Sequence, residues 1–428
     1  MRKLLIGCGI LFGVVTLLCV GSVWYLFREP NIQIPMREYP PNNAYERYRL
    51  LGERMYREFD GDTRFKQIED ALVRGATISA GERAYYLQRI EPYLRAYAPL
   101  TTQPSKVILE YGNPDQKFYE LAQFRRLVRA EAYLMREALR RQRYTEVANR
   151  LRRITLLAEQ ARAGGALIHY LVGTSILAIG WAPVREELPR LQNRELLQQL
   201  VQVARSYERQ RTPLWRALEE EQYNILALYQ QIAQGKRDLR TLASTPKAQT
   251  EQFRMPMRLL VNLASLELKR LMGRSIRELQ KPFHKRDLSV FRQEPKQLLN
   301  AIFYPVFFSA AEHELAEVAT MRLIGCVAAI HLHKLHTGSY PASLEALQLG
   351  EMAIDPYSGK PFRYRVDAKR GFLLYSVGEN RVDDGGAVPY DGFSEPRGDL
   401  SPVLVPAPKT LRPLDRNLRP LAPPQWLR

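Results

Sequence analysis

The longest uninterrupted apolar stretch of the chain lies at its N-terminus. Leu4 to Phe27 contains no charged residue, and about 20 apolar residues suffice for a helix to cross a bilayer core. The apolar part of a signal peptide is shorter, roughly 7–15 residues, so the pattern predicts a retained transmembrane helix. Arg2 and Lys3 precede it, whereas Arg28 and Glu29 nearly cancel after it. Because positive charge stays on the cytoplasmic side, we expect the rest of the chain to be extracytoplasmic.

Beyond the anchor, the pattern becomes periodic. Four prolines between Pro30 and Pro41 predict an extended spacer that holds the body off the membrane. From Ala44 onward, apolar residues recur at spacings of three and four, which is typical of amphipathic helices. Asn193 precedes one such segment and is expected to cap it. The segments are 44–59, 79–98, 117–142, 144–163, 165–188, 193–211, 213–234 and 253–280, with a further helix that ends near His336.

Two of these segments, 117–142 and 144–163, predict a helical hairpin. Their pattern loosely resembles a tetratricopeptide-type unit, although no second copy follows at a period of about 34 residues. A tetratricopeptide-like array and an irregular helical bundle therefore both remain open. The matching residues are Ala130, Tyr133, Leu134, Ala138, Tyr144 and Ala148.

The segment from Gly165 to Pro183 carries no charge. A helix that is apolar on every side is either central in a bundle or in lipid. The shortness of this segment, together with His169, Thr174 and Ser175, favours a buried central helix. A second membrane crossing is the alternative, and it would return the C-terminus to the cytoplasm.

The charge balance of the chain indicates what kind of partner it would bind. The 428 residues include 63 Lys and Arg against 45 Asp and Glu, a formal net charge of +18. This excess favours an anionic neighbour, such as a lipid or cell-wall surface. The positive charges are spread along the helices, so nucleic-acid binding is not expected.

Towards the C-terminus, the pattern changes to that of strands. Asp355-Pro356-Tyr357-Ser358-Gly359 is a turn signal. Two aromatic-rich runs, 362–365 and 371–378, follow at the distance of a β-hairpin. We therefore expect a small α+β module with an antiparallel sheet.

From about Ala319 to Gly386, the order of these features resembles the C-terminal domain of the major pseudopilin of type II secretion, a relative of type IV pilins. This resemblance implies a link to type II secretion or type IV pilus-like systems. The whole layout also resembles a bacterial single-pass membrane protein family, common in planctomycete-like lineages, that implies no established activity. Leu4 to Phe27 lacks the early glutamate of pilin-type subunits, so we expect a reused module in a protein of the bacterial inner membrane.

The loop after the last strand binds calcium in the pseudopilin family. The resemblance implies that Asn380, Asp383 and Asp384 are the ligands here, with Asp391 as an outer ligand. Hard oxygen ligands on a glycine-rich turn suit calcium. The alternative is that these residues only form the turn.

Other titratable clusters do not predict a site. His331 and His333 point to different sides of a helix and cannot share a metal there. Glu219 to Glu221 fan out around a helix axis, and we expect them to form a solvated charged face. The sequence contains no P-loop, dinucleotide fingerprint or nucleophile elbow.

Together, these patterns predict a mainly α protein with a non-enzymatic role. We expect a membrane-anchored extracytoplasmic scaffold whose helical body binds a protein partner. The alternative is a membrane-tethered enzyme whose active site in the body leaves no motif. The expected parts are a transmembrane anchor (1–28), a Pro-rich spacer (29–43), a helical body (44–310), a pseudopilin-like α+β module (311–400) and a Pro-rich basic tail (401–428).

Overall fold

The computed structural model of this chain describes a mainly helical protein with a small antiparallel sheet, as the sequence predicts. Most of the expected anchor, Leu4 to Phe27, lies outside the described residues, as does the tail from 402 onward. The described residues are 15–17, 20, 21, 24, 28, 29, 32–73, 76–237, 257–301, 305–367, 371–386 and 399–401.

The helices of the body follow the predicted segments closely. Their bounds are α2 (Ala44–Phe59), α3 (Thr63–Val73), α4 (Ala80–Tyr97), α5 (Tyr119–Arg140), α6 (Tyr144–Arg162), α7 (Leu167–Glu187), α8 (Arg194–Gln210), α9 (Leu214–Ala233), α11 (Met257–Leu279), α12 (Leu298–Ala301) and α13 (Pro305–Thr337).

Side-chain caps explain several of these boundaries. The Asn193 carboxamide oxygen accepts a hydrogen bond from the Leu196 N–H at 2.8 Å, so the predicted cap of α8 is confirmed. At α4, Ser79 and Glu82 form a reciprocal capping box. Helix α3 was not predicted, because it is short and buries few residues.

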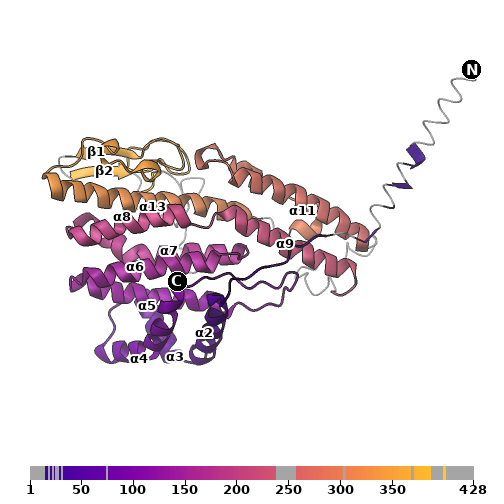
Figure 1. The fold of residues 1–428 in the computed structure, drawn as a ribbon, viewed down its shortest axis with the longest axis horizontal. Helices are drawn as coiled ribbons and strands as arrows, with labels where there is room; N and C mark the ends of the chain where they lie inside the picture. The colour runs from indigo at the N-terminus through magenta and orange to yellow at the C-terminus, as the bar shows by residue number, and fades with distance from the viewer. Residues whose placement is uncertain are drawn as a thin grey trace, which may run out of the picture.

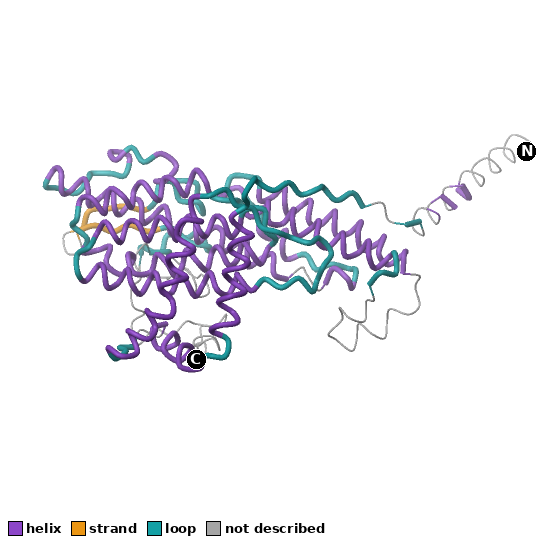
Figure 2. The backbone as a smooth tube through the Cα atoms, turned by 60° about the horizontal axis from the view of Figure 1, so that its bottom comes forward, coloured by secondary structure: helices purple, strands orange, loops and turns teal. Residues whose placement is uncertain are grey.

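The helices form an elongated body whose layers are visible in Figures 1 and 2. Helix α13 packs on α8, α6 packs on α7, and α5 lies against α7. Helices α2, α3 and α4 form a smaller group against α5, and the pair α9–α11 extends towards the N-terminus. The sheet lies at the end of the body away from the N-terminus in both views.

Among the described residues, two helices are long and apolar enough to cross a membrane, but protein surrounds most of their surface. Within Leu167–Arg190, which contains α7, 67% of the most apolar window is buried, and within Phe308–Thr337 of α13 the share is 89%. Helix α7 contacts α5, α6, α9 and α13. The structure thus places the segment from Gly165 to Pro183 inside the bundle.

The C-terminal sheet pairs β1 (Arg363–Asp367) with β2 (Gly371–Tyr375), Arg363 lying opposite Tyr375. Asp355, which is 1% exposed, connects the preceding turn to β2. Its carboxylate accepts hydrogen bonds from the Tyr357 and Val377 N–H groups and from the Ser376 hydroxyl, at 2.8–3.0 Å. The expected boundary at residue 310 falls inside α13, so body and module share that helix.

Candidate functional site

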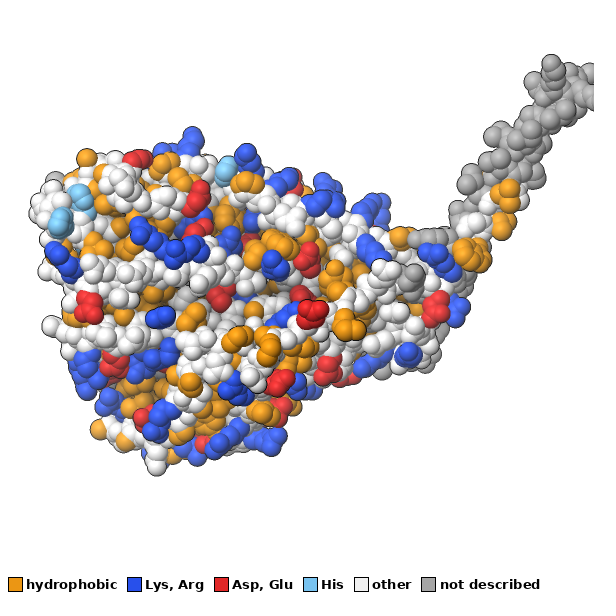
Figure 3. Space-filling view, viewed as in Figure 1, with side chains coloured by type: hydrophobic (Ala, Val, Ile, Leu, Met, Phe, Trp, Pro, Cys, Tyr) orange, Lys and Arg blue, Asp and Glu red, His pale blue; other side chains and the backbone are white. Residues whose placement is uncertain are grey.

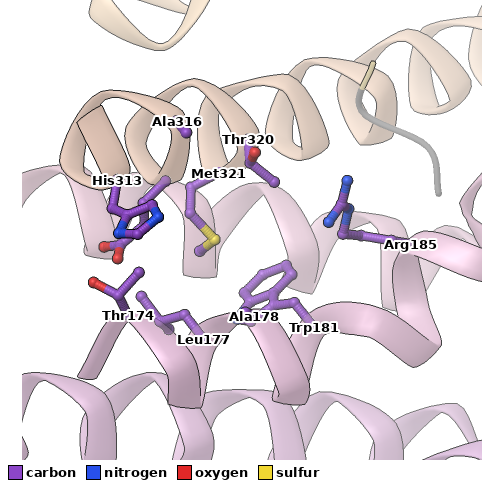
Figure 4. Close-up of a pocket in the computed structure, with 10 residues that line it drawn as sticks. Thr174, Leu177, Ala178, Trp181, Arg185, His313, Ala316, Thr320 and Met321 are labelled. Atoms are coloured by element: carbon purple, nitrogen blue, oxygen red, sulfur yellow. The ribbon is translucent and has the colours of Figure 1, made fainter. Parts of the chain in front are cut away.

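A narrow groove runs between α7 and α13 (Figure 4). Its volume of about 30 Å³ is enough for one or two water molecules, whereas small-molecule sites usually enclose about 300–1,000 Å³. The groove can therefore hold water but not a sizeable substrate. It is lined by Thr174, Leu177, Ala178, Trp181, Arg185, His313, Ala316, Glu317, Thr320 and Met321.

One end of this groove is formed by a buried ion pair. The Arg162 guanidinium, at the end of α6, donates to both oxygens of Glu317 on α13, at 2.8 and 2.5 Å. The Tyr207 hydroxyl donates to the same carboxylate at 2.6 Å. Burial opposes ionisation of Glu317, but Arg162 and the hydrogen bonds outweigh it and hold its pKa below the usual value. The pair therefore fixes α13 against α6 and α8.

A second buried carboxylate joins α13 to the segment after α11. Glu314 accepts hydrogen bonds from Arg286 at 2.7 Å, from Arg211 at 3.2 Å and from the Leu214 N–H at 3.0 Å. The side chains of Arg286 and Glu314 are 4% and 1% exposed. Glu314 thus has a structural partner for each oxygen.

An open cleft of about 470 Å³ lies beside this pair, at the contact between body and module. Lys285, Arg292 and Arg381 contribute positive charge to its wall. Glu312 of α13 meets Glu379, which follows β2; burial and the hydrogen bond with Glu379 raise the pKa of Glu312 to about 8. At neutral pH Glu312 therefore keeps its proton beside Glu379. Cleft and carboxyl pair together have the size and chemistry of a ligand site.

The proline-rich segment after the expected anchor is fastened to the body. We call residues 32–43 the strap; they contain no helix or strand. Arg37 forms an ion pair with Glu220 and donates to the carbonyl oxygens of Val107 and Gly164 at 2.8 and 2.6 Å. The segment is extended, as expected, and the strap lies on the body rather than running free of it.

The two ends of the strap are also held. Ile32 is buried in the apolar cluster around α9 and α11. Asn43 exchanges two hydrogen bonds with the backbone of Lys106, at 2.7 and 2.8 Å. Just before the strap, the Arg28 carbonyl accepts a hydrogen bond from Asn262 of α11 at 2.8 Å.

The expected solvated face of glutamates is also wrong for two of its three members. Glu220 binds Arg37, as described above. Glu221 accepts a hydrogen bond from the Leu167 N–H at 3.0 Å, at the start of α7. The side chains fan out as predicted, but they meet the strap and a helix N-terminus.

The loop residues expected to bind calcium are engaged with one another and with the sheet. Asp383 accepts a hydrogen bond from Tyr375 at 2.6 Å and pairs with Arg363 at 2.9 Å. Asn380 donates to Asp384 at 2.9 Å. Asp391 lies outside the described residues. Among the residues that the structure describes, no group of three or more His, Cys, Asp or Glu is placed to hold a metal ion.

Asp399 is a neighbour of this loop that sequence patterns did not indicate. One of its oxygens accepts from the Gly386 N–H at 2.6 Å, while the other is buried without a hydrogen-bond partner in the described structure. An orphaned carboxylate oxygen suits a cation, whereas Arg363 already neutralises Asp383. The carboxylates of Asp383 and Asp399 therefore fit a hard cation only if that cation displaces Arg363 from Asp383.

Two histidines line the cavities described above, His313 the groove and His284 the open cleft. His331 and His333 are both on α13. His331 packs edge-on against Phe372 at 5.6 Å, and burial lowers its pKa. His169 is fully buried beside Phe118, and burial lowers its pKa to about 3, so it is neutral at pH 7. These contacts give His331 and His169 packing roles.

Comparison with known proteins does not add a family to this description. Neither a protein-family model, nor a curated protein, nor a solved structure matches the chain.

Proposed function

We propose that this chain is a non-enzymatic scaffold, anchored by one N-terminal helix in the bacterial inner membrane, with its body outside the cytoplasm. Its helical body would bind a protein partner. The observation that carries this proposal is the fastening of the strap by Ile32, Arg37 and Asn43. An unattached linker lets a domain sample many positions, whereas a fastened one sets a fixed distance and orientation. That geometry suits a protein that presents a surface at a defined place beside the membrane.

The same proposal assigns α13 and the sheet to a reused pseudopilin-like module, with a link to type II secretion or pilus-like systems. The long helix, the turn pinned by Asp355 and the hairpin follow one another in the expected order. The apolar surface of α13 is covered by α8 and α7. The body therefore provides the apolar surroundings that the helix needs, which supports a module built into a larger protein.

The cleft between body and module favours a second candidate, a membrane-tethered enzyme. Glu312 lies there beside Glu379, and a carboxyl group with a raised pKa, as Glu312 has, is suited to general acid chemistry. In this alternative the active site would lie at the contact with the module, beside Arg292 and Arg381.

Photo-crosslinking in the native membrane tests the first proposal. A crosslinking residue is placed at Leu50, which is 66% exposed on α2, in the otherwise unchanged full-length chain. A scaffold should give one discrete protein adduct. Arg37→Ala should weaken or shift that adduct, whereas Arg57→Ala, at a 78% exposed side chain, should leave it unchanged.

Crosslinking sites on the exposed faces of α5 and α8 extend the test to the rest of the body. The absence of a discrete adduct at all of these positions would contradict the scaffold. Turnover of a substrate that Glu312→Gln abolishes would establish the enzyme instead.

A further inference from the structure

Helix α11 carries most of its charge without partners. Elsewhere in the body many arginines pair with carboxylates, as Arg162 and Arg322 do. By contrast, five exposed cations of α11 have no carboxylate within ion-pair distance in the described part of the chain. At 3.6 residues per turn they fall within about 160° of the helix circumference. We call them the α11 stripe: Arg258, Lys269, Arg270, Arg274 and Arg277.

The acidic residues of α11, Glu267 and Glu278, lie at one edge of this stripe and are used by other groups. Glu267 accepts hydrogen bonds from the Lys296 and Gln297 N–H groups and from Asn300. Glu278 is buried and binds Lys281 and the Asp287 N–H. Both carboxylates are thus used to hold the segment that follows the helix, and the outward face stays positive.

An exposed apolar side chain lies within the stripe. Leu266 is 46% exposed, and its position on the helix falls between Lys269 and Arg277. At a membrane surface, helix cations contact anionic headgroups while apolar side chains enter the boundary with the acyl chains, so this surface offers a partner to both kinds of side chain.

The stripe begins beside the expected anchor. Asn262 of α11 donates to the carbonyl of Arg28, the residue directly after the predicted transmembrane helix, at 2.8 Å. Arg270 is eight residues further on, about 12 Å along the axis. Figure 3 shows Lys and Arg side chains along the upper edge of the molecule, where α11 runs towards the anchor. A bilayer surface is therefore held near the stripe by the chain itself.

We propose that the α11 stripe is a contact surface for the anionic headgroups of the bilayer that holds the anchor. This inference rests on the anchored topology proposed above and adds a second point of membrane contact. The first contact is the anchor, and the second would orient the body. The attraction arises between side-chain cations and headgroup phosphates, so it depends on lipid charge and weakens with salt.

The test uses the full-length chain reconstituted in vesicles. In a Cys8→Ser, Cys19→Ser background, Leu266→Cys carries a bimane label; Cys326 is buried and unreactive. The vesicles contain nitroxide-headgroup lipid in phosphatidylcholine, with or without phosphatidylglycerol. Quenching of the label should rise with phosphatidylglycerol and be lost at high salt. A label at Leu50→Cys on α2 should show neither effect.

Charge reversal identifies the residues responsible. Arg270→Glu, Arg274→Glu and Arg277→Glu together should abolish the quenching that depends on phosphatidylglycerol. The matched control reverses three exposed arginines of α8, Arg194, Arg205 and Arg209, and should preserve it.

Three results would overturn the inference. Quenching that ignores phosphatidylglycerol, or survives reversal of the stripe, would exclude an electrostatic contact. Binding of dextran sulfate that the reversal abolishes, without quenching by the vesicles, would assign the stripe to a soluble polyanion. Flotation of the protein with vesicles checks the anchor separately, so a failed anchor and a failed stripe give different results.

Discussion

The side chains that hold α13 in the body are charged, although they are buried. Arg162 is 0% exposed and Glu317 is 6% exposed. Removing one member of such a pair leaves the other charge buried, at a cost of about 3–5 kcal/mol.

Glu317→Gln should therefore lower the free energy of unfolding of the full-length chain by about 3–5 kcal/mol, measured by denaturant titration in detergent. Glu186→Gln is the control, because its surface pair with Arg136 is 37% and 42% exposed and should be worth less than about 1 kcal/mol. Equal losses in the two variants would contradict a structural role for the buried pair.

Two carboxyl groups of α13 should respond to pH in opposite directions. The pKa of Glu317 is held below its usual value, so its contribution is present above about pH 4.3 and is lost as the pH falls further. The pKa of Glu312 is raised to about 8, so the folded protein keeps a proton that the unfolded chain releases. Stability therefore falls as the pH rises from about 4.3 towards 8.

Melting temperatures measured across this range test the signs. Glu312→Gln should flatten the decline on the alkaline side, and Glu317→Gln should flatten the decline on the acidic side. Profiles that keep their shape in both variants would show that other groups control the pH dependence.

The calcium proposal is tested at the loop. A ligand at about 100 times its dissociation constant stabilises the folded state by roughly 2.7 kcal/mol. The full-length chain should therefore melt several degrees higher with millimolar calcium than with chelator, and Asp384→Ala should remove the difference. Asp70→Ala, at an exposed carboxylate of α3, should not. Identical curves for the unchanged protein would leave Asn380, Asp383 and Asp384 as turn residues.

Sequence patterns could predict candidate site residues only where those residues lie close together in one segment of the chain. Asn380, Asp383 and Asp384 could be proposed as ligands because they lie close together in one loop that the resemblance covers. Arg37 and Glu220 were missed because they are 183 positions apart, and a single arginine in a proline-rich segment gives no signal. Asp399 was also missed, because it is 13 positions from Gly386 in the sequence and only the folded chain brings the two residues together.

At the scale of elements, boundaries could be predicted where a cap stands beside a periodic segment. Asn193 caps α8 as expected. Helix α3 was overlooked because it buries only Phe65, Ile68 and Glu69, too few for a clear period, although Asp62 caps its first turn at 2.9 Å from the Phe65 N–H. The helix expected to end near His336 begins at Pro305, before the expected boundary at residue 310, and proline is tolerated in the first turn of a helix.

The burial of α7 leads to a prediction about topology. Because α7 is covered by α5, α6, α9 and α13, it should not cross the membrane. Reporter fusions after Pro35, after Pro189 and at the C-terminus should all report the extracytoplasmic side. A cytoplasmic signal from the last two alone would establish a second crossing.

At the scale of the whole molecule, the strap sets how the body is connected to its expected anchor. Arg37→Ala leaves Glu220, which is 19% exposed, with the Tyr111 hydroxyl but without a cationic partner, and we expect a loss of about 1–3 kcal/mol. Amide hydrogen exchange of the strap should become faster, while α5 and α6 keep their protection. Arg57→Ala is the matched control, and equal protection of the strap in both variants would contradict its fastening by Arg37.

On the extracytoplasmic topology proposed above, the apolar length of α13 gives the newly made chain a competing fate during export. The segment Phe308–Thr337 has the length and composition that would allow it to stay in the bilayer. Arg322, near the middle of that segment, costs about 2.5–3.5 kcal/mol at the centre of a membrane helix. In the folded body it pairs with Glu208 of α8 at 2.5 Å. The Arg322 guanidinium therefore disfavours insertion of α13 into lipid and stabilises its packing in the body. This one side chain thus favours folding of α13 into the body over its retention in the membrane.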